Sequence, residues 1–131
     1  MQIKNTPLKQ LSEEWLNNLG TSEGFPNNEA SLLAFEEVCY LAEHHPERAW
    51  QFILIAIDEF KSNEEKLNQI AASPLEDLLN FHGENIIGLV EKEASNNPVL
   101  SNMFCSMYKG KINSEIWNKI QILGNCGNNA N

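Results

Sequence analysis

Acidic and imidazole side chains come together at one place in the sequence. Glu76, Asp77 and His82 occupy one short segment, and Asp58 and Glu59 lie earlier in the chain. Carboxylates and imidazoles bind metal ions and transfer protons in acid/base catalysis. These residues define an enzymatic hypothesis, in which the chain is a metal-dependent or acid/base hydrolase that uses Glu76, Asp77 and His82.

The spacing within this segment favours a structural role instead. Asp77 and His82 are five positions apart, which separates them by about 140° around a helix. Glu76 and Asp77 fit the first turn of a helix, where carboxylates stabilise the helix dipole. His82 fits a last turn, where a side-chain donor serves free carbonyl groups. This interpretation predicts no catalytic residue, no metal and no cofactor.

The other candidate ligands are histidines and cysteines. His44 and His45 are adjacent, and adjacent residues on a helix point in different directions, so the pair cannot chelate one ion. Cys39, Cys105 and Cys126 are far apart in sequence and form no CxxC motif. An odd number of cysteines without a pattern predicts unpaired, reduced thiols and a cytoplasmic location.

The sequence also lacks signals for a membrane. The N-terminus has no apolar stretch typical of a signal peptide. The longest apolar run, residues 52–57, is far shorter than the roughly 18 residues that a membrane-spanning helix needs. We therefore expect no association with a membrane.

The elements that position these residues are predicted to be helices, because apolar residues recur at helical spacing and no segment alternates like a strand. We expect an all-α fold of about eight short helices in a compact antiparallel bundle, with stacked helical hairpins as an alternative shape. Residues 1–123 form a single domain, and residues 124–131 form a flexible tail. The expected helices cover residues 8–19, 28–44, 46–61, 62–72, 73–83, 84–94, 97–110 and 113–122.

Residues typical of helix caps set several of these boundaries. Ser62 and Ser73 each precede a Glu by three residues and fit the N-cap of a capping box. Asn97 precedes a proline and fits an N-cap, and Asn113 or Ser114 caps the last helix.

Four segments between His45 and Trp117 share residues with a known protein family. They are His45-Pro46-Glu47-Arg48-Ala49-Trp50, Ala71-Ala72-Ser73-Pro74-Leu75-Glu76-Asp77-Leu78-Leu79, His82-Gly83 and Ile116-Trp117. In these segments the chain resembles an uncharacterised bacterial family of small all-helical proteins, although Ser73 stands where Gly is more usual. The resemblance implies a helical bacterial protein, and it implies no reaction and no catalytic residue.

The charge is strongly acidic and unevenly distributed. The net charge is −9, which argues against binding to nucleic acid or to an anionic membrane. Between Ser12 and Phe60 the chain has ten acidic residues and one basic residue, Arg48. An acidic surface of this kind attracts basic partners.

The second helix concentrates these acids. At 100° per residue, Phe35, Val38, Cys39 and Ala42 share the core side. The opposite side interleaves apolar and acidic residues, and it is our candidate partner-binding surface. Its residues are Glu29, Leu33, Glu36, Tyr40 and Glu43, with Glu37 at its edge.

Two interpretations of this stripe remain open. An exposed Tyr ringed by carboxylates is typical of a surface that binds a basic protein. The same pattern is also found on a solvated face that only keeps a protein soluble. The first interpretation predicts a non-catalytic protein-binding module, such as an immunity protein that neutralises a basic toxin. The alternatives are the hydrolase described above and a structural subunit of a larger complex, and the sequence does not indicate the oligomeric state.

Overall fold

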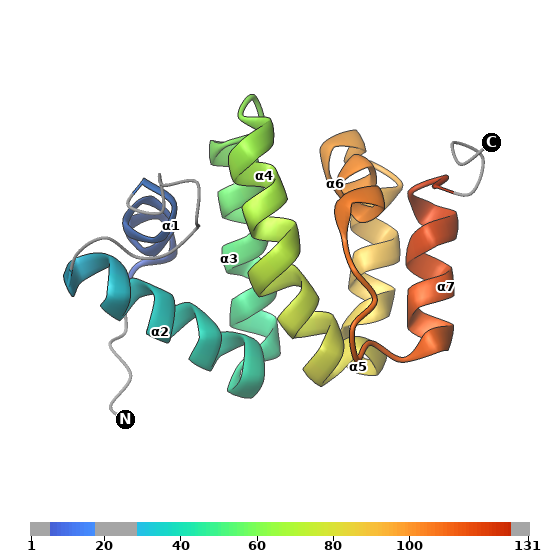
Figure 1. The fold of residues 1–131 in the computed structure, drawn as a ribbon, viewed down its shortest axis with the longest axis horizontal. Coiled ribbons are helices and arrows are strands. Elements are labelled where there is room, and N and C mark those ends of the chain that lie inside the picture. Colours follow the sequence, from blue (N-terminus) through green and yellow to red (C-terminus); the bar gives the residue numbers. More distant parts are fainter. Residues whose placement is uncertain (1–5, 18–28, 127–131) are drawn as a thin grey trace.

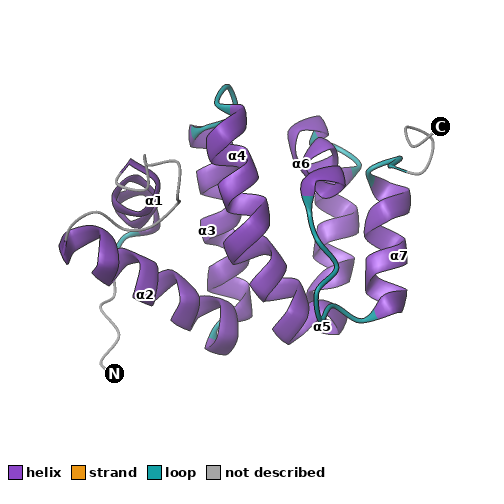
Figure 2. Ribbon diagram, viewed as in Figure 1, coloured by secondary structure: helices purple, strands orange, loops and turns teal. Residues whose placement is uncertain are grey.

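The structure is a computed structural model that describes residues 6–17 and 29–126. Within these residues every regular element is a helix, so the all-α prediction is confirmed (Figures 1 and 2). When elements that follow one another without a break are joined, the described chain has six helices and not the eight expected. None of these helices is long and apolar enough to cross a bilayer.

The helices follow one another from the N-terminal to the C-terminal end of an elongated molecule (Figure 1). Their bounds are α1 Leu8–Asn17, α2 Glu29–His44, α3 Pro46–Glu59, α4 Glu64–Ile70, the π-helical turn η1 Ala71–Leu75, α5 Glu76–Ala94, α6 Pro98–Met103, the 3-10 turn η2 Phe104–Ser106 and α7 Ser114–Leu123. The end of the first expected helix and the start of the second lie at residues 18–28, outside the described residues.

The expected helix boundary at Ser73 is wrong. The helix of α4 continues through η1 into α5, and Pro74 lies inside the π-helical turn. The proline ring collides with the carbonyl group four residues earlier in a regular α-helix, and a widened π turn relieves this collision. The start of α4 also differs, since Asn63 and not Ser62 is the N-cap: its side chain accepts a hydrogen bond from the Lys66 amide.

The boundary expected near Gly83 is confirmed as a kink. His82 has non-helical backbone angles (φ −136°, ψ 24°), and the second half of α5 turns back from the first half. Gly83 then packs closely on α7, where a Cβ atom on this glycine would lie 3.3 Å from Ile116 Cγ1. The N-caps Asn97 and Asn113 are also confirmed, each accepting hydrogen bonds from backbone amides of the first turn.

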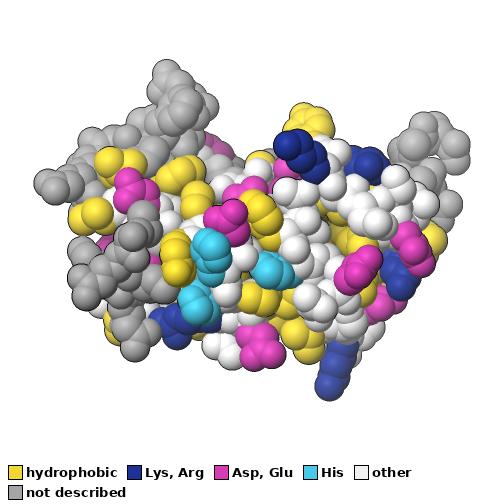
Figure 3. Space-filling model, turned by 90° about the horizontal axis from the view of Figure 1, so that it is seen from below, with side chains coloured by type: hydrophobic (Ala, Val, Ile, Leu, Met, Phe, Trp, Pro, Cys, Tyr) yellow, Lys and Arg dark blue, Asp and Glu magenta, His cyan; other side chains and the backbone are white. Residues whose placement is uncertain are grey.

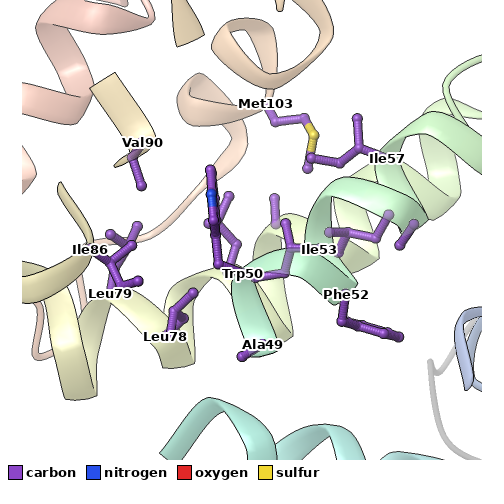
Figure 4. Packing of buried hydrophobic residues seen from close by; sticks show 14 of the residues in the cluster. Ala49, Trp50, Phe52, Ile53, Ile57, Leu78, Leu79, Ile86, Val90 and Met103 are labelled. Carbon is purple, nitrogen blue, oxygen red and sulfur yellow. The ribbon is translucent and has the colours of Figure 1, made fainter. Parts of the chain in front are cut away.

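The core is organised around α3, whose buried residues extend along most of its length. Trp50 projects from α3 between Ile86 and Val90 of α5 on one side and Ile53 on the other (Figure 4). Helix α1 closes the N-terminal end of this core, where Trp15 meets Phe52 edge-to-face with ring centroids 6.1 Å apart. Helix α3 contacts α1, α2 and α5, and α2 also packs directly on α5, so these helices form one continuous core.

The cysteines do not all remain unpaired as expected. Cys105 and Cys126 form a disulfide, and Cys39 is the only free thiol among the described residues. The disulfide fastens the end of α7 to η2, so Gly124 and Cys126, which we assigned to a flexible tail, pack against the domain. The prediction failed because pairing depends on proximity in the fold, which cysteine spacing does not reveal. The argument from unpaired thiols to a cytoplasmic location therefore loses its premise.

Candidate functional site

The structure separates the roles of the three residues of the enzymatic hypothesis. Glu76 Oε2 accepts a hydrogen bond from the backbone N–H of Tyr108 (3.0 Å), so this carboxylate fixes the connection that leads to α7. His82 Nε2 donates to the carbonyl oxygen of Glu43 (2.6 Å). Neither Glu76 nor Asp77 lies at a free helix N-terminus, because η1 continues into α5. The helix-dipole explanation for these two acids is therefore wrong.

Asp77 lies in the contact between α5 and α2 close to Cys39. Burial raises the pKa of the Asp77 carboxyl above its ordinary value. Burial, followed by the negative charges of Asp77, Glu36 and Glu43, raises the pKa of the Cys39 thiol to about 11. A thiol in this environment stays protonated at neutral pH, and the thiolate is the nucleophilic form. Cys39 is therefore poorly suited to nucleophilic catalysis.

The described residues contain no ready-made metal centre. Over residues 6–17 and 29–126, no three His, Cys, Asp or Glu side chains form a group that could hold a metal ion. The supposed ligands Glu76 and His82 instead contact backbone groups of other elements. The sequence interpretation of His82 as a donor to a free helix carbonyl agrees with this contact, although the carbonyl belongs to α2 and not to its own helix.

The outer side of α2, which is the candidate partner-binding surface, carries two exposed leucines. Leu32 and Leu33 are 46% and 41% exposed. Glu43 is also exposed, and Glu36 and Tyr40 are half-buried. Glu29 begins α2, but its side chain lies outside what the structure describes. Helix α2 contains no Lys or Arg, so this side combines leucines with unbalanced carboxylates.

Glu37 departs from the expected stripe. Its side chain is only 8% exposed, and Oε1 accepts a hydrogen bond from the Thr6 hydroxyl (2.9 Å), while Oε2 is buried without a hydrogen-bond partner. The carbonyl oxygen of Thr6 accepts a bond from Arg48 Nη2 (2.7 Å). Thr6 thus contacts both α2 and α3 and covers Glu37, a contact that the periodicity of α2 alone could not predict.

The acids between Ser12 and Phe60 also do not form one continuous field. Glu59 accepts a hydrogen bond from the Ser12 hydroxyl (3.0 Å), and Asp58 lies 3.7 Å from the Lys61 ammonium. In the view of Figure 3 the acidic side chains are separated by apolar and uncharged groups. Glu36 and Glu43 have no Lys or Arg on their own helix, so we keep the acidic surface of α2 as the candidate site.

One group of side chains on this face was not expected from the sequence. The Tyr40 ring lies beside two imidazoles, with centroids 4.5 Å from His44 and 5.7 Å from His45. His44 Nε2 is 3.2 Å from Glu43 Oε2. We call Tyr40, Glu43, His44, His45 and His82 the histidine cluster; Figure 3 shows that all three histidines of the chain share this face.

The chain matches the Family of unknown function (DUF6869) over residues 23–125. It belongs to this family. The match covers α2 to α7, and so it includes the helix with the exposed leucines and the histidine cluster. No curated protein and no solved structure matches the chain.

In this member of the DUF6869 family, part of the candidate site was visible in the sequence and part was not. Leu32 was overlooked because it stands at the edge of the stripe on a helical projection. His44 and His45 were considered only as metal ligands, and not as neighbours of Tyr40 four and five positions earlier. A residue four positions away on a helix is a side-chain neighbour, so this signal was available. His82 reaches the same place only through the fold.

Proposed function

We propose that this protein is a non-catalytic protein-binding module whose outer α2 side binds a basic partner. The supporting observation is the combination of exposed Leu32 and Leu33 with Tyr40 and the carboxylates of Glu36 and Glu43. Tyr supplies a large contact area at low entropic cost and is enriched among residues that dominate binding energy. The carboxylates would attract the partner and exclude acidic competitors.

The form of this function that we favour is a bacterial immunity-type inhibitor, which neutralises a basic toxin by binding to it. Toxins that attack nucleic acids carry basic surfaces, because they must neutralise phosphates. An acidic inhibitor with an apolar centre can occupy such a surface. The net charge of −9 and the absence of Lys and Arg from α2 support this choice of partner.

The test is a binding measurement with matched variants. The probe is the purified product of the gene adjacent to the one encoding this protein, titrated by calorimetry. Leu33→Ala, Tyr40→Ala and Glu43→Lys would each weaken binding by at least about tenfold, since central contacts typically cost more than 1 kcal/mol. Leu89→Ala and Glu91→Lys are controls, because these side chains are exposed on α5 and lie outside the proposed surface. Equal affinity of all five variants would eliminate the α2 surface.

An acid/base hydrolase is a second candidate, and the raised pKa of Asp77 is the observation in its favour. Carboxyls with raised pKa values are common at catalytic sites. The hypothesis requires Asp77→Asn to abolish a hydrolytic activity while the variant remains folded. If the α2 variants lose binding to the partner and the wild type has no hydrolytic activity, the binding module is favoured.

A further inference from the structure

We propose that protonation of the histidine cluster switches off binding of a basic partner at mildly acidic pH. This inference rests on the proposed function, since it concerns regulation of the same α2 surface. Its basis is the contact of Tyr40, the residue expected to dominate binding, with His44 and His45, together with the hydrogen bond that brings His82 to Glu43 of the same helix. The arrangement is produced by the fold, through the end of α2 and the kink in α5.

Tyr40 and the imidazoles are in direct contact. The rings of His44 and His45 flank Tyr40 with centroid distances of 4.5 and 5.7 Å. Any partner group that covers Tyr40 must therefore approach two imidazoles as well. His82 joins the end of the same helix, because its Nε2 atom lies 2.6 Å from the Glu43 carbonyl oxygen.

Charged groups of α2, α3 and α5 lie near the cluster, including Glu84 of α5, which lines a pocket together with His82. Helix α2 contributes Glu36 and Glu43, and α5 contributes Asp77 beside the neutral thiol of Cys39. Helix α3 contributes Glu47 and Arg48, which line a shallow pocket together with His44 and His45.

Among these groups the carboxylates outnumber the one guanidinium, so the region is negative when the imidazoles are neutral. Each imidazolium ion would add one positive charge to it. Histidine is the side chain that ordinarily changes charge between about pH 5 and 8.

The direction of the effect follows from these charges. At pH 7.5 the carboxylates attract cationic groups of the partner to Tyr40. Protonated imidazoles next to Tyr40 would repel the same groups, and a protonated His44 would pair with Glu43, which lies 3.2 Å away. Each exposed charge pair contributes only modestly to binding. Loss of two or three attractive pairs, and their replacement by repulsion, therefore corresponds to about a tenfold loss of affinity.

The test uses an octalysine peptide as the probe and NMR titration of backbone amides in the full chain. At pH 7.5 the peptide should shift amide signals of α2, and at pH 5.5 its affinity for this site should be about tenfold lower. The variant His44→Gln/His45→Gln should bind at pH 7.5 and retain most of its affinity at pH 5.5. Adding His82→Gln should remove the remaining pH dependence, and circular dichroism verifies that each variant is folded.

The outcomes separate the two proposals. Binding at α2 that weakens at low pH to the same extent in wild type and in the histidine variants would overturn the switch and leave the binding surface intact. If binding of the wild type at α2 does not weaken at low pH, the switch is likewise overturned and the binding surface stays intact. If octalysine at pH 7.5 shifts no α2 signals, the proposed binding surface is wrong and the switch is wrong with it.

Discussion

The Nε2 atom of His82 lies 2.6 Å from the carbonyl oxygen of Glu43, and this contact joins the kink of α5 to the C-terminal end of α2. The last four carbonyl groups of a helix have no partner within that helix. His82 supplies one from a residue 39 positions away. The kink thus places His82 in the histidine cluster. The His82 side chain in turn provides a hydrogen-bond partner for a carbonyl group at the end of α2, the helix that carries the candidate surface.

Replacement of His82 by Ala should therefore destabilise the fold. The lost hydrogen bond predicts a decrease of about 1 kcal/mol in the free energy of unfolding, measured by urea denaturation at pH 7.5. His45→Ala is the control, because His45 is exposed and its side chain makes no capping hydrogen bond. If both variants lost the same stability, the Glu43 contact would have no special role.

The disulfide predicts a dependence of stability on redox conditions. Cys105 and Cys126 are separated by 21 residues, and closing a loop of this size typically stabilises a protein by about 2–4 kcal/mol. Dithiothreitol should lower the free energy of unfolding of the wild type by this amount and leave Cys126→Ser unchanged. Thiol titration of the unreduced, denatured chain should detect one thiol, that of Cys39. Detection of three thiols would contradict the bond.

Two glycines should respond to alanine in opposite directions. A Cβ atom on Gly124 would lie 3.0 Å from both Phe104 Cβ and the Ser101 carbonyl oxygen, and 2.9 Å from the sulfur of Cys126. Gly124→Ala should cost about 1–3 kcal/mol, because the end of α7 must move away from α6. Gly88 lies within α5 with no atom in the way, so Gly88→Ala should stabilise by about 0.5–1 kcal/mol through its helix propensity. Urea denaturation measures both, and loss of stability in Gly88→Ala would contradict the open space around Gly88.

Local features of the sequence were sufficient for most helix positions. Asn97 and Asn113 cap helices as predicted, since an N-cap depends on a side chain and the amides a few residues later. The prediction of an N-cap at Ser73 failed because the same local pattern also fits a π turn that tolerates Pro74. Only the packing of α4 and α5 as one helix distinguishes the two, and this packing involves residues remote in sequence.

Contacts between distant segments account for the other errors at the candidate site. Glu37 is buried because Thr6 covers it, 31 residues away. Cys105 and Cys126 meet because Gly124 allows the end of α7 to approach η2. A helical projection of one segment contains no information on these neighbours.

Asp77 should make stability depend on pH in a direction opposite to that of most carboxylates. Burial raises the pKa of Asp77 in the folded state above the value of about 3.9 expected in the unfolded chain. The folded state therefore binds the proton more tightly, so the stabilising effect of protonation is complete below about pH 4 and is lost as the pH rises through the folded pKa. Asp77→Asn cannot ionise, and its stability relative to wild type should increase from about pH 4 upward and then become constant. Glu84→Gln, an exposed change on the same helix, should show no such increase in urea denaturation between pH 3 and 8. A wild type that instead gained stability over Asp77→Asn with rising pH would show that the carboxylate is stabilised in the fold, and that burial is not the dominant effect.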